Sequence, residues 1–260
     1  MPQPRALVLR APGTNCDEET AAAWSLAGAQ VASAHIGVVV ADPGLLDAYQ
    51  ILTIPGGFSF GDDLGAGRIL ASRLGSVLGD TLQRFRDRGG LVLGICNGFQ
   101  VLVKAGLLPG LPADLGAATL TFNDSGHFES RWVCLTPRPG SSPFLTDPDP
   151  IELPVAHGEG KFMVARPELL ARLEAAGQVV LRYAEPAGGP ATSFPANPNG
   201  STGAVAGLCD PSGQIFGLMP HPERHVESIH HPRWTRRRRP SDQAGDGLRI
   251  FRNAVRAFSA

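Results

Sequence analysis

The residue best suited to chemistry in this sequence is a cysteine framed by glycines. Cys96 is the third residue of GICNG (94–98), which continues the apolar run LVLGI. Small residues on either side of a nucleophile let the chain turn sharply from a strand into a helix and expose the middle side chain. The helix start favours a thiolate, and the backbone N–H of Asn97 can point at a developing oxyanion. The pattern favours a nucleophile over a small cysteine buried at a strand end.

A histidine followed two residues later by a carboxylate supplies a candidate base. His221 and Glu223 lie in PHPE (220–223), directly after the apolar segment QIFGLM. In a Cys-His-acid system the imidazole takes the thiol proton, while the carboxylate holds one tautomer and stabilises the charged ring. The flanking prolines fix the backbone. Alone, the pair is equally compatible with a metal pair or a surface loop.

A zinc site is the main chemical alternative, and it needs a third ligand. His157 and Glu159, in HGE (157–159), form a conceivable second pair. That interpretation leaves the turn around Cys96 unexplained, so the sequence predicts no metal site. The four cysteines include no CxxC pair, which excludes zinc ribbons and thioredoxin-type motifs.

Two further segments can complete a site around the thiol. Gly56 and Gly57 follow a strand candidate, and adjacent glycines let backbone N–H groups approach a ligand, which suits a second oxyanion donor. A plain tight turn is the alternative, and a phosphate loop is disfavoured because GK[ST] and GxGxxG are absent. Gln100, one helical turn beyond Cys96, faces the same side and can bond a substrate amide.

The elements that must position these residues alternate in the first half of the chain. Strand candidates at 6–9, 30–36, 50–54 and 91–95 alternate with helix candidates at 17–26, 68–88 and 97–105. This rhythm predicts an α/β fold with a doubly wound, mostly parallel sheet, whose ligands bind beyond the carboxyl ends of the strands. The glycine loop and the Cys96 turn both follow such ends.

From residue 119 onward short strands and turns dominate. Strand candidates lie at 119–122, 131–135, 179–183 and 204–208, a hairpin is expected at 211–213, and an amphipathic helix closes the chain at 247–258. We therefore expect antiparallel strands added to the sheet within a single domain, 1–260. The one composition break is a polar loop, 230–246, that carries four consecutive arginines, Arg236 to Arg239.

Composition sets limits on function. Among 260 residues, 43% are hydrophobic and 18% charged, with a net charge of −1, so overall charge favours neither nucleic acid nor an anionic membrane. The N-terminus does not resemble a signal peptide, and no segment approaches the length of a membrane span. The expected location is a reducing, cytoplasmic compartment with free thiols.

Several longer motifs allow a closer assignment: PGGFSFGDDLGAGRILA (55–71), GICNGFQ (94–100), AHGEGKF (156–162), FPANPNGS (194–201), GLMPHPERHVE (217–227) and LRIFRNAVRAF (248–258). Together they resemble the glutaminase component of phosphoribosylformylglycinamidine synthase, a class I (triad) glutamine amidotransferase. The resemblance covers nearly the whole chain, from TNCDEET onward. The cysteine turn and PHPE mark the broad class, whereas PGGFSFGD, HGEGKF, PANPNGS and RIFRNA are more specific. Phe60 stands where family members often carry tyrosine.

The resemblance implies a flavodoxin-like glutaminase fold and a thioester mechanism. Cys96 would attack the carboxamide of L-glutamine, His221 would take the thiol proton, and Glu223 would orient His221. The implied oxyanion hole and substrate contact are the N–H groups of Gly57 and Asn97 and the side chain of Gln100.

The resemblance also implies partners. No stretch resembles the ATP-dependent synthetase that converts formylglycinamide ribonucleotide to formylglycinamidine ribonucleotide, so the ammonia would pass to a separate synthetase subunit, with a small third subunit. We expect no cofactor in this chain, with ATP and Mg²⁺ on the synthetase. His157 and Glu159 form either a glycine-pinned turn or a partner-sensing loop, and the arginine run either a docking element or a solvated loop. Asn15-Cys16-Asp17 is open between helix capping and an interface.

Two other functions remain open on the residues alone. A different cysteine hydrolase, or a glyoxalase-like protein of the same architecture, would share the cysteine turn but would not need PANPNGS, RIFRNA or a late His-x-Glu. A non-catalytic interaction subunit would not need all three of Cys96, His221 and Glu223.

Overall fold

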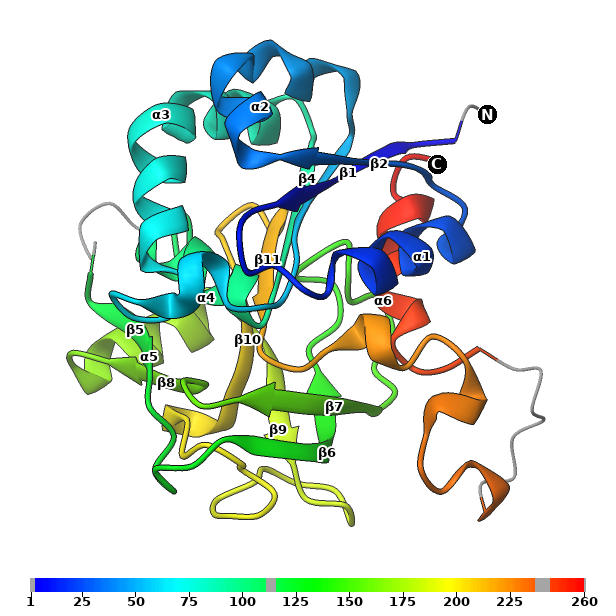
Figure 1. Ribbon diagram of the computed structural model, residues 1–260. Helices are drawn as coiled ribbons and strands as arrows, with labels where there is room; N and C mark the ends of the chain where they lie inside the picture. Colours follow the sequence, from blue (N-terminus) through cyan, green and yellow to red (C-terminus); the bar gives the residue numbers. More distant parts are fainter. Residues whose placement is uncertain (1–2, 111–115, 237–243, 260) are drawn as a thin grey trace.

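The described residues fold around one nine-stranded mixed sheet (Figure 1). The computed structural model describes residues 3–110, 116–236 and 244–259. Across the sheet the strands are, in spatial order, β2 (Gln30–His35), β1 (Arg5–Arg10), β3 (Ile51–Ile54), β4 (Leu91–Ile95), β11 (Ile215–Leu218), β10 (Val205–Cys209), β9 (Val179–Ala184), β6 (Glu129–Pro137) and β7 (Ile151–His157). A separate two-stranded sheet pairs β5 (Ala118–Thr121) with β8 (Lys161–Val164).

The sheet has a parallel half and an antiparallel half. From β2 to β11 neighbouring strands are parallel, and from β11 to β7 each strand is antiparallel to the one before it. This confirms the predicted α/β fold with a doubly wound parallel sheet and added antiparallel strands. The predicted hairpin is the β10–β11 pair.

Helices cover both faces of the parallel half (Figure 1). The helices are α1 (Asp17–Ala27), α2 (Ile36–Ala41), α3 (Arg68–Asp87), α4 (Asn97–Lys104), α5 (Pro167–Ala175) and α6 (Leu248–Arg256). On one face α1 packs against α6, with the Trp24 and Phe251 rings edge to face at 4.8 Å, and on the other α3 packs against α4. No helix among the described residues has the length and hydrophobicity needed to cross a bilayer.

The strongest sequence patterns correspond to observed elements. β3 and β4 are buried at every position, as continuous apolar runs in a parallel sheet predict. Helix α1 carries acidic residues in its first turn and ends at Gly28, which adopts φ 100°.

Among the α-helices and β-strands of the described residues, four were not predicted: α2, β7, β8 and α5. The IGVVVA sequence of α2 is rich in β-branched residues, but the His35 side chain accepts a hydrogen bond from the Gly37 N–H and so caps a helix there. Strand β7 contains Pro154, which argues against a central strand. It lies at the edge of the sheet, where proline is tolerated.

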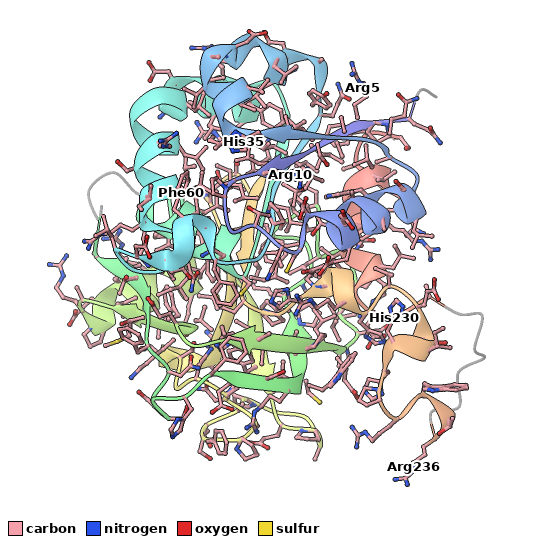
Figure 2. All side chains as sticks on the ribbon, viewed as in Figure 1. Arg5, Arg10, His35, Phe60, His230 and Arg236 are labelled. Carbon is pink, nitrogen blue, oxygen red and sulfur yellow. The ribbon has the colours of Figure 1, made fainter. Side chains whose placement is uncertain are left out.

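Part of the polar segment 230–246 lies outside the described residues, including Arg237, Arg238 and Arg239. The described part forms two short 3₁₀ turns, η6 (Ser228–His230) and η7 (Trp234–Arg236). Arg236 lies at the outer edge of the molecule (Figure 2). The predictions made for the arginine run stay predictions.

The order of the strands brings the chemical motifs to one edge. Strand β4 runs parallel to β11, with Ile95 opposite Leu218, and parallel to β3, with Gly94 opposite Ile54. The cysteine turn follows β4, PHPE follows β11 and the glycine loop follows β3, all at carboxyl ends. Because such ends meet at the same edge of a parallel sheet, segments far apart in sequence converge there.

We expect Gly98→Ala to destabilise the fold although alanine is the better helix former. A Cβ on Gly98 in α4 would lie 1.8 Å from the carbonyl oxygen of Ile54, so helix or strand must shift. We expect a loss of about 3 kcal/mol in the free energy of unfolding, measured by urea denaturation. The matched control is Gly79→Ala in α3, where the added Cβ has no neighbour within 4 Å among the described side chains and should stabilise by about 0.5–1 kcal/mol. Equal effects at the two positions would contradict the close approach of α4 to β3.

Candidate active site

Cys96 occupies a strained position at the start of α4. Its backbone has φ 50° and ψ −105°, values that cost a non-glycine residue about 1–3 kcal/mol. The turn is held by a hydrogen bond from the backbone N–H of Cys96 to the Leu218 carbonyl, 2.8 Å. It is also closely packed at Gly94, where an added Cβ would lie 2.7 Å from the Gly98 carbonyl oxygen. The fold maintains this strain to present the thiol at the sheet edge.

His221 and Glu223 form a buried pair beside this thiol. Nδ1 of His221 lies 2.6 Å from Oε1 of Glu223, and both side chains are at most 2% exposed. The backbone N–H of His221 donates to the Pro154 carbonyl, 2.8 Å, which anchors His221 to strand β7. Nε2 has no hydrogen-bond partner among the described residues, and the Cys96 thiol lies close enough to interact with the ring. Nε2 is therefore the nitrogen available to take the thiol proton.

The electrostatic environment favours a charged imidazole. Burial lowers the pKa of His221, but the Glu223 carboxylate and Cys96 outweigh burial and hold the pKa well above its ordinary value. A proton can thus rest on His221 beside the Cys96 sulfur. A charged imidazole next to a cysteine stabilises the thiolate form and so activates the nucleophile.

A cavity of about 160 Å³ opens beside Cys96. Its walls come from the glycine loop, α4 and the turn after β7, and its lining includes Gly57, Asp62, Gln100, His157 and Glu159. Pockets for drug-sized molecules are typically about 300–1,000 Å³, so this cavity suits a smaller ligand, such as one amino acid.

Two backbone N–H groups next to Cys96 and in the glycine loop are candidate oxyanion donors. In the described chain no backbone hydrogen bond uses the N–H of Gly57 or Asn97, so both can donate to a ligand. The Asn97 side chain fixes their spacing, because its Oδ1 accepts from the Ser59 N–H, 3.2 Å, and its Nδ2 donates to Asp62, 3.1 Å. These bonds tie the glycine loop to the start of α4.

Gln100 joins α4 to the turn after β7. Its Oε1 accepts from Nδ2 of Asn97, 3.0 Å, and its Nε2 donates to the Glu159 carbonyl, 2.5 Å. Gln100 therefore shapes the cavity wall, and its direct contact with substrate stays a prediction.

His157 lies inside a polar network below the same wall. Its side chain is 3% exposed, and its ring nitrogens face Oδ1 of Asn123, 3.1 Å, and Nδ2 of Asn199, 3.5 Å. The Asn199 amide can only donate to Nε2, so the neutral Nδ1–H tautomer fits the network. Burial, together with the charge of His221, lowers the pKa of His157 to about 4. Because His157 is buried, a partner could affect it only through this network. Glu159, in contrast, is half-buried and lines the cavity. The predicted interface role of the two residues stays a prediction.

The structure places two residues at the site that the patterns did not assign to it, Cys16 and Arg224. The sequence leaves Cys16 open between helix capping and an interface; it is the N-cap residue of α1, but its side chain makes no capping hydrogen bond. Cys16 follows β1 at the same sheet edge, and its sulfur, His221 and Glu223 offer ligand atoms that all lie within 4.8 Å of one another. Arg224 donates to this sulfur at 3.0 Å. One sequence feature could have placed Cys16 at the site: NCD (15–17) follows the first strand of the parallel half, and so lies beyond a carboxyl end of the sheet.

Known proteins resemble this chain along nearly its whole length. Residues 3–258 match the CobB/CobQ-like glutamine amidotransferase domain. A phosphoribosylformylglycinamidine synthase subunit PurQ of Dehalococcoides mccartyi is 48% identical over 98% of both chains, and one of Methanococcus maripaludis is 38% identical over 98% of both. Among solved structures, that of PurLQS from Thermotoga maritima covers 100% of both chains with 30% identity and a TM-score of 0.74.

Fold and similarity thus define a glutamine amidotransferase. The chain belongs to the CobB/CobQ-like glutamine amidotransferase domain family.

The neutral His157 predicts a specific pH dependence of stability. The folded pKa of about 4 lies below the ordinary 6.5, so the unfolded chain binds the extra proton and stability falls as the pH drops from 6.5 towards 4. Between pH 7.5 and pH 5, we expect the free energy of unfolding to decrease by about 2 kcal/mol less in His157→Gln than in the wild type, measured by urea unfolding at both pH values. Groups common to both proteins cancel in this difference. Identical losses would show that His157 is not held neutral.

Proposed function

We propose that this chain is the glutaminase subunit of phosphoribosylformylglycinamidine synthase, in purine biosynthesis. It hydrolyses L-glutamine to glutamate and delivers the ammonia to an ATP-dependent synthetase subunit that converts formylglycinamide ribonucleotide to formylglycinamidine ribonucleotide. One observation carries the chemistry: parallel strands β4 and β11 present Cys96 and the His221–Glu223 pair beside a cavity of amino-acid size. The names of the relatives support the pathway.

The first half of the reaction forms a thioester and releases ammonia. Nε2 of His221 holds the thiol proton while the Cys96 sulfur attacks the carboxamide carbon of glutamine. The N–H groups of Gly57 and Asn97 hold the negative oxygen of the tetrahedral intermediate. His221 then gives its proton to the amide nitrogen, the carbon–nitrogen bond breaks and ammonia leaves. Glu223 stays ionised and keeps the ring oriented throughout.

The second half restores the enzyme. His221 takes a proton from a water molecule, whose oxygen attacks the γ-glutamyl thioester. The carbon–sulfur bond then breaks, the proton returns to the Cys96 sulfur and glutamate departs. The acidic side chains on the cavity wall, Asp62 and Glu159, favour the ammonium group of the substrate.

The partner is the synthetase subunit, together with a small third subunit. Three phenylalanines that line the cavity, Phe58, Phe122 and Phe128, are 48%, 70% and 54% exposed. Apolar groups gathered at a cavity mouth are typical of an interaction surface, and a partner seated there would keep ammonia from escaping. PurLQS, the name of a structural relative, supports an assembly of several subunits.

The remaining parts of the proposal concern the surroundings of the reaction. ATP and Mg²⁺ bind the synthetase, and this chain carries no cofactor of its own. The cytoplasm is the proposed compartment, since Cys16, Cys96, Cys134 and Cys209 are all free thiols. The chain acts on neither nucleic acid nor membrane.

We expect Cys96→Ala to abolish glutamine-dependent activity and to leave ammonia-dependent activity intact. Without the sulfur no thioester forms, so glutamate release should fall at least ~10⁴-fold, and Glu223→Gln should lower it about 10²- to 10⁴-fold. The assay measures glutamate and formylglycinamidine ribonucleotide in the complex with the synthetase. Added ammonium salt serves as the control for assembly. Glutamine-dependent turnover in Cys96→Ala would contradict the thioester mechanism.

We expect Phe122→Asp to weaken binding of the synthetase by at least about 10-fold. The variant places a charge in an apolar contact that the complex would bury. Dissociation constants would be measured by analytical ultracentrifugation. Leu26→Asp, at an equally apolar position on α1 that is 51% exposed, is the matched control and should leave affinity unchanged. If the two variants bind alike, the cavity mouth is not the docking surface.

A further inference from the structure

A second buried thiol lies against the general base. Cys16 is 1% exposed, and its sulfur, a ring nitrogen of His221 and a carboxylate oxygen of Glu223 all lie within 4.8 Å of one another. The close contact needs Gly56, because a Cβ there would lie 2.8 Å from Cε1 of His221 and 3.1 Å from the Cys16 sulfur. The Cys16 sulfur and the Cε1–Nδ1 side of the imidazole thus both adjoin Gly56, while Glu223 bonds Nδ1.

Cys16 is also tied to the two segments that flank the base. Nη2 of Arg224 donates to its sulfur at 3.0 Å, and the same guanidinium pairs with Glu19 on α1, 3.4 Å. The Cys16 N–H donates to the Gly56 carbonyl, 3.3 Å, immediately before the candidate oxyanion donor Gly57. One residue thus touches the base, the turn that follows the base and the glycine loop.

We propose that Cys16 is a positioning residue for the reaction: it holds the imidazole of His221 at a fixed place between Cys96 and Glu223 and in register with Gly57. The inference rests on the proposed roles of Cys96 and His221. Misplacement of a catalytic group by about 1 Å can cost about 10²-fold in rate, so a contact of this kind has a large effect. A polarisable sulfur suits contact with an aromatic edge.

Two other roles for Cys16 fit the geometry less well. As a nucleophile it is disfavoured, because burial raises the pKa of its thiol and it does not line the cavity that contains Cys96. As a metal ligand with His221 and Glu223 it is disfavoured, because the Arg224 guanidinium already donates to the sulfur and would repel a cation. Its thiol instead donates to Oδ1 of Asn15, 3.2 Å, as a neutral thiol can.

The test compares Cys16→Ala with Cys16→Ser, which restores a polar atom that can accept from Arg224. We expect Cys16→Ala to lower kcat for glutamate release about 10- to 100-fold, with KM for glutamine within about 2-fold. Cys16→Ser should recover most of this loss. The matched control is Cys209→Ala, which removes a similarly buried thiol on β10, 2% exposed, and should lower stability without changing kcat.

A second readout does not need glutamine. The rate of alkylation of Cys96 by iodoacetamide, followed over pH by peptide mass spectrometry, reports the imidazole beside the sulfur. Cys16 contributes to the raised pKa of His221, so its removal should move the step due to His221 to lower pH. The other titratable groups acting on His221 or its partners are unchanged in the variant: Glu223, Cys96, Arg224, His157, Glu19 and Glu129.

The outcomes separate the inference from the proposed function. Wild-type kcat and an unshifted alkylation profile in Cys16→Ala would overturn the positioning role. So would equal losses in the alanine and serine variants with the profile unmoved, since that result describes packing alone. If the wild-type chain released no glutamate, the proposed function would fail, and the alkylation profile would still decide the role of Cys16.

Discussion

The site depends on the parallel pairing of β4 with β11. This pairing places Ile95 opposite Leu218, and the Leu218 carbonyl accepts the N–H of Cys96 itself. One ladder therefore sets the spacing between Cys96 and His221, although they are far apart in sequence. Strand β3, on the other side of β4, brings the glycine loop to the same edge. A shift of one residue in either ladder would turn these side chains to the other face of the sheet.

Burial then gives the placed groups their chemistry. Glu223 and His221 are shielded from water, so their hydrogen bond is stronger than at the surface and outweighs the tendency of burial to keep the imidazole neutral. His157 has no carboxylate on its ring and is held neutral in the same region. Two histidines near one cavity thus occupy opposite charge states, because one pairs with an acid and the other with amides.

Sequence patterns predicted the parts of this arrangement that rest on local rules. The cysteine turn needs small neighbours, and β3 and β4 are unbroken apolar runs, so strand, turn and helix around Cys96 could be predicted from residue types. Strand β7, whose last residue His157 lines the cavity, was missed because Pro154 obscures its pattern. The glycine-pinned turn that follows it was one of the two interpretations of HGE. The contact of Cys16 with His221 joins the first strand to the last, and no local pattern encodes a contact of that kind.

The central claim is that Cys96 carries a γ-glutamyl thioester during turnover. The most direct measurement mixes the chain, in complex with its synthetase, with glutamine, quenches the mixture in acid within a turnover and examines the peptide that contains Cys96 by mass spectrometry. The account predicts a γ-glutamyl adduct on that sulfur, which disappears on treatment with hydroxylamine. Glutamate release without an adduct at Cys96, or an adduct on another residue, would contradict it.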